Sequence, residues 1–344
     1  MMERIKPDSE NGVPLFAWVP ERLGPEGRYQ WVSALSTGGQ GYAELYRDTW
    51  SNGLVVVKGF WWNTRELDPG AAAVRRSARE ESFHASVDIQ LQLSHLTQSV
   101  PSVVELVSEI SPTRRKLGKL VPDGAGAPDI NHESFLVMQF VGDADGTSQS
   151  LRSLVEKEGP LSSAEAVSLA DQVAAGLEAM HTPRQRRSSE RSGSGSEGPR
   201  YYWAHSDLKP DNILVSGSPR RFTLIDHSAA KQVHAVRDQD DLPRPDYATD
   251  AFAPPDLDEP LTNRFDVYSL AATLVYALTG EPPGSGDEPL KTARDLAALS
   301  VHPTLVRLIA SCLDANPSFR VTAPAFRRDL AAVNAFATFE VLSR

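Results

Sequence analysis

The stretch of sequence that decides the fold runs from His205 to Val215 and reads HSDLKPDNILV. It places Asp207 five residues before Asn212, with Lys209 between them, on a predicted loop that leads into an apolar strand. A second carboxylate, Asp226, directly follows the apolar run FTLI at residues 222–225. Two carboxylates, an amide and an ammonium group are therefore concentrated in a short length of chain.

These four side chains make up the set that phosphoryl transfer from a nucleotide needs. The reaction needs a carboxylate to accept a hydroxyl proton, oxygen ligands for a metal on the phosphates, and a cation for the developing charge. Asp207 suits the first role, Asn212 and Asp226 the second, and Lys209 the third. Hard oxygen ligands together with phosphates favour Mg²⁺. The stretch therefore predicts a phosphoryl-transfer site.

The composition narrows the class of protein. A chain of 344 residues, 40% hydrophobic and 23% charged, is long enough for two globular lobes. Its net charge of −10 argues against a nucleic-acid partner. The single cysteine, Cys312, lies in an apolar run, which indicates a buried structural thiol in a reducing compartment. Without an apolar run of ~18 residues or a signal peptide, we expect no membrane partner and a cytoplasmic location.

The order of the predicted elements indicates the fold class. Strand patterns cover residues 28–35, 42–47, 54–57, 103–107 and 135–141. Helical patterns follow over residues 70–96, 164–181 and 265–279, the first with Val74, Phe83, Val87 and Leu91 at helical spacing. This order predicts an α+β protein with a small β-rich N-terminal lobe (residues 29–140) and a larger helical C-terminal lobe (residues 141–344). Residues 1–28 are interpreted as an N-terminal extension, and 182–200 as a flexible Arg/Ser/Gly insertion.

The stretch around Asp207 resembles the catalytic loop of the protein kinase family, H-R-D-x-x-x-x-N followed by D-F-G. Three later segments resemble the same family in the same order: TDAFAPPD at 249–256 (T-x-x-Y-x-A-P-E), DVYSLA at 266–271 (D-V-Y-S-L-G) and NPSFR at 316–320 (x-P-x-x-R). The matches extend over roughly residues 29–335. DLKP is similar to the Ser/Thr-directed subfamily. The resemblance implies a divergent, eukaryotic-like (Hanks-type) Ser/Thr protein kinase with the bilobal kinase fold.

The resemblance assigns nucleotide-binding residues in the N-terminal lobe. Gly38, Gly39 and Gly41 form a glycine-rich turn whose backbone amides would lie over the phosphates. Lys58 ends the run VVVK and resembles the lysine that contacts the nucleotide phosphates. Its carboxylate partner would be Glu80 or Glu81. Glu80 is preferred, because the apolar residues 83, 87 and 91 lie on roughly its own helix face.

The remaining residue roles also follow from the resemblance. In LVMQFV at 136–141, Met138 would be the gatekeeper, while Gln139 and Val141 would offer backbone hydrogen bonds to adenine. Ala43, Val56 and Leu214 complete the nucleotide-binding set. Catalysis is assigned to Asp207, Lys209, Asn212 and Thr249, the metal to Asn212 and Asp226, and an Asp256–Arg320 bridge to structure. Asp266 is expected to brace the catalytic loop. The implied cofactors are ATP and Mg²⁺, and the implied partner is a protein substrate of unknown identity.

Two departures from the family pattern carry their own expectations. Ser206 replaces the arginine of H-R-D, which grips a phosphate in the activation loop through charge-assisted hydrogen bonds. Serine has no such group, so activity is expected not to depend on phosphorylation of residues 227–255. His227 and Ser228 replace the Phe and Gly of D-F-G. His227 is then expected to face His205, with His84 nearby, and to make activity depend on pH.

Two other functions are compatible with the same residues. The replacements at 206, 227 and 228 are also those of a nucleotide-binding pseudokinase with a regulatory or scaffold role. HSD and the triplet IDH at 225–227 are similar to small-molecule phosphotransferases of the aminoglycoside or choline kinase type. Joint retention of the five chemically active residues favours a catalyst over a pseudokinase: Lys58, Asp207, Lys209, Asn212 and Asp226.

Overall fold

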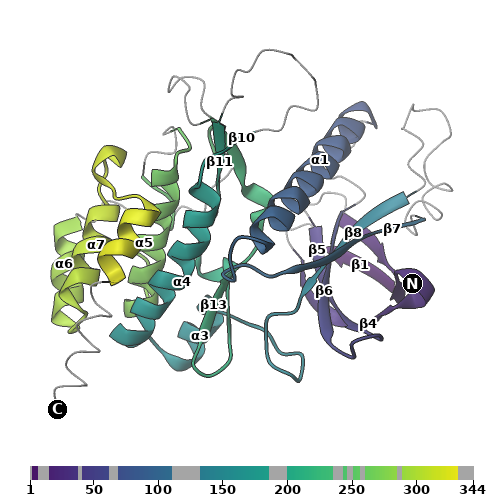
Figure 1. The fold of residues 1–344 in the computed structure, drawn as a ribbon, viewed down its shortest axis with the longest axis horizontal. Coiled ribbons are helices and arrows are strands. Elements are labelled where there is room, and N and C mark those ends of the chain that lie inside the picture. The colour runs from purple at the N-terminus through teal and green to yellow at the C-terminus, as the bar shows by residue number, and fades with distance from the viewer. Residues whose placement is uncertain are drawn as a thin grey trace. The chain divides into compact units, whose positions relative to one another are not determined.

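The structure is a computed structural model that describes residues 2–6, 15–37, 41–61, 69–110, 132–185, 200–234, 243–245, 251–255, 260–284 and 289–331. The chain divides into two compact units. Unit 1 contains Met1–His95 and Pro101–Phe140, and unit 2 contains Leu96–Val100 and Val141–Arg344. Strands dominate unit 1 and helices dominate unit 2 (Figure 1). The predicted α+β class, with a β-rich N-terminal part and a helical C-terminal part, is confirmed.

Unit 1 is built on an antiparallel six-stranded sheet. Its strand order is β3 (Arg22–Leu23), β4 (Tyr29–Thr37), β5 (Gly41–Asp48), β6 (Leu54–Phe60), β8 (His132–Gln139) and β7 (Val103–Ile110). The two edges of the sheet are joined. Arg28, next to β4, donates to the Glu105 carboxylate of β7 at 2.8 Å, and the amide of Gly24 donates to Glu109 Oε1 at 2.9 Å. The sheet therefore curls around a core that contains Val55 and Val57.

The segment before β4 belongs to this core. Strand β1 (Met2–Lys6) pairs with β2 (Leu15–Val19), and Val19 and Leu23 are fully buried with Tyr29 and Trp61. The sequence interpretation places residues 1–28 outside the lobe as an extension, whereas the structure gives them two core side chains. Val19 ends the apolar run LFAWV of β2, which the polar and Pro/Gly-rich surroundings obscure, and Leu23 lies in a two-residue strand with no periodicity to detect.

Helix α1 (Pro69–Ser94) confirms the helix predicted at residues 70–96. Its residues Phe83 and Val87 are buried against Phe60 of β6 and Leu136 of β8. Val74, predicted to share the apolar face, is instead 70% exposed. Val74 lies more than two turns before Phe83, where the buried cluster under α1 begins, so its apolar spacing has no core to join.

Unit 2 is centred on two adjacent helices, α4 (Ser163–His181) and α5 (Asn263–Thr279) (Figure 1). Ser162 caps α4 in a capping box with Glu165. Helix α5 is buried nearly all round. Around them lie α3 (Leu151–Glu158), α6 (Pro289–Ala298) and α7 (Pro303–Cys312). None of the described helices is long and apolar enough to span a bilayer.

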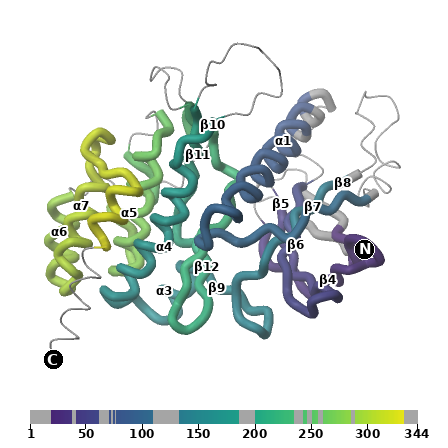
Figure 2. The backbone as a smooth tube through the Cα atoms, in the orientation of Figure 1, coloured from purple at the N-terminus to yellow at the C-terminus, as the bar shows by residue number. Residues whose placement is uncertain are grey.

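Two small sheets complete unit 2 and carry the functional loops. One contains β9 (Gln149–Ser150), β12 (Ile213–Ser216) and β13 (Arg221–Leu224), with α3 beside it (Figure 2). The other contains β10 (Arg184–Gln185), β11 (Arg200–Ala204) and β14 (Lys231–His234). Most of the predicted insertion at 182–200 lies outside the described residues.

Gly59 tests the close packing inside unit 1. An alanine there would place its Cβ 2.5 Å from the ring of Tyr42, which is buried. We expect Gly59→Ala to lower the free energy of unfolding by about 1–3 kcal/mol, because an overpacked core forces side chains from their rotamers. Chemical denaturation measures this. Gly53→Ala is the control, since its nearest contact is the movable Ser51 hydroxyl at 3.3 Å. Equal stability of the two variants would contradict the packing described.

Candidate active site

A single buried carboxylate holds the start of the loop that follows β11. Asp266 of α5 is fully buried. Its Oδ2 accepts a hydrogen bond from the amide of His205 at 2.8 Å, and its Oδ1 accepts one from the amide of Ser206 at 2.9 Å. The predicted bracing of the loop by Asp266 is confirmed. His181, the last residue of α4, adds a third contact through Nε2 at 2.8 Å from Oδ2.

The charge of Asp266 is stabilised by these partners. Burial raises the pKa of the Asp266 carboxyl, but the hydrogen bond with His181 and the backbone donor of His205 outweigh burial and leave the pKa below its usual value. The folded chain therefore favours the ionised carboxylate at this position.

Asp207, Lys209 and Asn212 form one hydrogen-bonded cluster in the loop. Lys209 Nζ donates to Asp207 Oδ2 at 2.8 Å. The side-chain nitrogen of Asn212 donates to the carbonyl of Asp207 at 2.8 Å and to its Oδ2 at 3.2 Å. Asn212 ends the short 3-10 helix η2 (Pro210–Asn212), so its amide closes the loop back on Asp207. Three of the four predicted catalytic side chains are thus brought together, and the fourth, Thr249, lies outside the described residues.

The two predicted metal ligands lie at the same end of the β12–β13 hairpin. Asn212 directly precedes β12, Asp226 follows β13, and the amide of Ile225 donates to the carbonyl of Asn212 at 2.9 Å. Because the amide nitrogen of Asn212 is directed to Asp207, its oxygen points away from that residue. Among the described residues no three His, Cys, Asp or Glu side chains gather as a metal site. One carboxylate and one amide oxygen fit Mg²⁺, which commonly takes its other ligands from phosphate and water.

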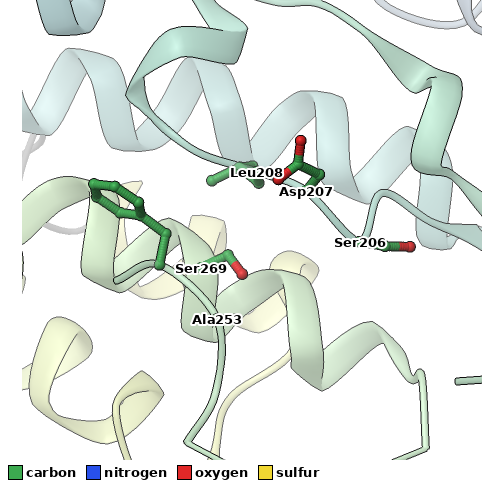
Figure 3. Close-up of a pocket in the computed structure, with 6 residues that line it drawn as sticks. Ser206, Asp207, Leu208, Ala253 and Ser269 are labelled. Carbon is green, nitrogen blue, oxygen red and sulfur yellow. The ribbon is translucent and has the colours of Figure 1, made fainter. Parts of the chain in front are cut away.

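Ser206 occupies an unusual backbone position beside a small pocket. Its φ of 68° lies in the left-handed region, and its hydroxyl is buried and donates to the Ala204 carbonyl at 3.4 Å. The pocket is lined by Ser206, Asp207, Leu208, Phe252, Ala253 and Ser269. Figure 3 shows the side chains of Ser206 and Asp207 leaving the loop in different directions, with Ser269 and Ala253 on the opposite wall. The position that carries the family's arginine thus has a short, inward-facing hydroxyl.

The predicted contact between His205 and His227 is confirmed. Their ring centroids are 5.4 Å apart, and both side chains are buried. His205 Nε2 lies 3.3 Å from the carbonyl of Ile225, so it links the loop to the segment that carries Asp226. His84 belongs to unit 1, where its Nε2 lies 4.0 Å from Glu80 Oε1. Its part in a cluster of three imidazoles stays a prediction.

Strand register brings four nucleotide-site candidates onto one face of the sheet in unit 1. Lys58 pairs with Ala43 of β5, and Val56 pairs with Met138 of β8. Residues paired across strands share a face, as do residues two apart on one strand. Ala43, Val56, Lys58 and Met138 therefore lie together, although they come from three strands.

Helix α1 packs on that same face. The rings of Phe60, two residues after Lys58, and Phe83, three residues after Glu80, are 5.2 Å apart. Glu80 is partly buried, whereas Glu81 is exposed and accepts only a long bond from Ser77 at 3.5 Å. This geometry supports Glu80 as the residue nearer Lys58, and the pairing itself remains a proposal.

The other nucleotide-site candidates have structural contacts of their own. The amide of Gln139 donates to the Ser102 carbonyl at 2.8 Å, and the carbonyl of Val141 accepts from Ser148 at 2.8 Å. Leu214 is half-buried in β12. Gly41 has a steric reason to be glycine, because a Cβ there would lie 2.2 Å from the carbonyl oxygen of Gly59.

Four predicted residues lie outside the described residues: Gly38, Gly39, Thr249 and Asp256. The Asp256–Arg320 bridge therefore stays a prediction. Arg320 itself is 1% exposed and donates to the carbonyls of Asp314 at 2.8 Å and Ala315 at 3.1 Å, so it ties down the chain that follows α7.

Comparison with known proteins identifies the family. The model of the protein kinase domain matches residues 74–329. The chain belongs to the protein kinase family. The matched residues begin inside α1, so the strands that carry Gly41 and Lys58 precede them.

Several curated bacterial kinases resemble this kinase. The Serine/threonine-protein kinase PknD of Mycobacterium tuberculosis is 31% identical over 56% of this chain and 27% of its own length. PknB of Mycolicibacterium smegmatis is 26% identical over 58% of this chain and 30% of its own length. PknE of Mycobacterium tuberculosis is 28% identical over 52% of this chain and 27% of its own length. The matched residues span less than a third of each relative.

Two residues of this region escape prediction from the sequence. His181 completes the shell around Asp266, and Arg152 of α3 binds Asp211 in the loop with bonds of 2.8 and 2.9 Å. Their partners are 85 and 59 residues away in the chain, so no local pattern marks them. The position of His181 at the end of an amphipathic helix is the only available signal, and it indicates equally a solvated helix end.

Asp266 makes unit 2 sensitive to acid. Its folded pKa is depressed, so its stabilising contribution is complete above the unfolded value, about 4, and is lost as the pH falls through the lower folded value. Asp266→Asn should lower stability at pH 7 by about 3 kcal/mol or more. It should also lose less stability than the wild type below pH ~4. Urea unfolding from pH ~2.5 to 7 measures both.

Asp295→Asn serves as the control, because Asp295 is 63% exposed and meets Lys291 only at 3.7 Å. It should follow the wild-type profile. If the acid dependence of Asp266→Asn also matched the wild type, the ionised Asp266 would not be the anchor described.

Proposed function

We propose that this kinase transfers the γ-phosphoryl group of ATP to Ser or Thr hydroxyls of a protein substrate. The observation that carries the proposal is the bonded cluster of Asp207, Lys209 and Asn212, with bonds of 2.8 to 3.2 Å, on a loop anchored by buried Asp266. The relatives named Serine/threonine-protein kinase add support, although they match only part of this chain. DLKP is similar to the Ser/Thr-directed subfamily.

Each residue has a role that its surroundings support. Asp207 orients the acceptor hydroxyl and takes its proton, for which it is held by Lys209 and Asn212. Lys209 neutralises the negative charge on the transferred phosphoryl group, and before substrate binds it neutralises the negative charge of Asp207. Asn212 and Asp226 would hold Mg²⁺, which supplies charge neutralisation on the phosphates. Lys58 of unit 1 would contact the phosphates with Glu80 beside it, and Thr249 of unit 2 would help to seat the acceptor.

We further propose that activity does not depend on phosphorylation of residues 227–255. A phosphate there is usually recognised by the arginine of H-R-D, and this chain has Ser206. The Ser206 hydroxyl is buried, and it donates to the backbone of Ala204. Across the pocket lie apolar groups of Phe252 and Ala253, both buried. The start of the loop is held by the Asp266 carboxylate of α5 through the backbone amides of His205 and Ser206.

Asp207→Asn tests the proposed chemistry. With radiolabelled ATP and Mg²⁺, the wild type should incorporate label into protein, and the variant should lose on the order of 10²–10⁴-fold in kcat. Its affinity for ATP should stay close to that of the wild type, because the carboxylate acts on the acceptor. Asp226→Asn is the comparison and should also weaken metal-dependent nucleotide binding. Nucleotide binding without transfer would indicate a pseudokinase, and transfer only to small hydroxylated compounds a small-molecule phosphotransferase.

Phosphatase treatment tests the independence from phosphorylation. Purified kinase is dephosphorylated, the phosphatase is removed, and the initial rate of transfer to an added protein substrate is measured before label accumulates on the kinase. The rate should stay within about twofold of the untreated enzyme, since Ser206 provides no guanidinium for a phosphate. Mass spectrometry verifies removal of phosphate. Loss of activity after treatment, regained on incubation with ATP, would contradict the proposal.

A further inference from the structure

Asp211 of the catalytic loop is already paired within the chain. Arg152, the second residue of α3, donates from Nε to both carboxylate oxygens of Asp211, at 2.8 and 2.9 Å. Both side chains stay partly exposed, at 32% for Arg152 and 44% for Asp211. The pair therefore lies at the surface of unit 2, where a bound peptide could contact it.

Aromatic rings hold Arg152 from a second direction. Its guanidinium carbon lies 5.7 Å from the ring centroid of Phe252 and 5.2 Å from that of Tyr276. The two rings meet edge to face at 6.0 Å. A guanidinium fixed by stacking and by a carboxylate keeps one orientation, unlike a free surface arginine. Arg152 is thus a charge of fixed position.

This charge is close to where an acceptor must bind. Phe252, under Arg152, lines the same pocket as Asp207. The hydrogen bond from Asn212 to the Asp207 carbonyl, at 2.8 Å, folds the loop so that Asp211 stays near Asp207. An extended peptide advances about 3.3 Å per residue. A substrate side chain a few residues from the acceptor therefore reaches the Arg152–Asp211 pair.

We propose that Arg152 is a specificity-determining residue that selects acceptor peptides with neutral or acidic residues, and against basic residues, beside the phosphorylated Ser or Thr. This inference rests on the proposed function. An unpaired Asp211 would attract Lys or Arg from the substrate. Arg152 neutralises the Asp211 carboxylate and repels a Lys or Arg side chain of the substrate. The pair therefore disfavours basic peptides through electrostatic repulsion.

The test uses three peptides that share one acceptor Ser and carry Arg, Ala or Glu on both sides of it. The measured quantity is the ratio of kcat/KM for the Arg peptide to that for the Glu peptide. The wild-type ratio should be below one. Arg152→Gln should raise the ratio about tenfold by unmasking Asp211, and Asp211→Asn should lower it by unmasking Arg152. The double variant should lie between the two.

Arg220→Gln is the matched control. Arg220 also binds two carboxylates of unit 2, Glu158 and Glu165, both at 2.5 Å, at the opposite end of α3. Its removal should leave the ratio at the wild-type value. General damage to folding lowers kcat/KM for all peptides together and does not move the ratio.

The outcomes separate the two proposals. Transfer with the same ratio in the wild type, Arg152→Gln and Asp211→Asn would overturn the inference and leave the proposed function standing. Failure of the wild type to phosphorylate any peptide or protein would overturn the proposed function, and this inference with it.

Discussion

The carboxylate of Asp266 is the constraint on which the arrangement of the catalytic loop depends. A buried ion is costly unless its oxygens are satisfied, and here two backbone amides and the His181 imidazole supply the donors. Meeting this requirement fixes the start of the loop against α5 and the end of α4. Because the loop closes on itself through Asn212, the position of Asp207 follows from the position of this one anchor. A shift in the anchor therefore becomes a shift in the proposed base.

This kinase retains the family's residues for phosphoryl transfer but has replaced residues that the family uses for regulation. Asp207, Lys209 and Asn212 are bonded to one another, and Asp226 lies at the same hairpin end as Asn212. Ser206 lacks the phosphate-binding group of the family's arginine, and the His227 ring packs at a tilt against His205 where the family has phenylalanine. The start of the loop is held from within the chain, by the Asp266 carboxylate and the amides of His205 and Ser206. The retained catalytic residues, together with the missing phosphate-binding arginine, support the proposal that activity does not depend on phosphorylation of residues 227–255.

Features encoded by short sequence patterns could be predicted, whereas contacts between residues far apart in the chain could not. Period-two and helical patterns predict β4 to β8 and the helices α1, α4 and α5, but not α3, α6 or α7. The helix face of Phe83 and Val87 also favours Glu80. The resemblance supplied the contact of Asp266 with the loop. Core residues such as Leu23 were missed, because a two-residue strand has no period. The pairs His181–Asp266 and Arg152–Asp211 join distant segments with no local signal, and only the fold reveals them.

The kinetics of Asp266→Asn test most directly whether Asp266 positions the catalytic loop. They are measured at neutral pH, under conditions where circular dichroism shows the variant folded. A small displacement of a catalytic group lowers the rate of the chemical step far more than it lowers binding. If Asp266 positions the loop, kcat should fall at least about tenfold, with the KM for ATP changed less than about threefold. A folded variant with wild-type kcat would show that Asp266 does not position the catalytic loop.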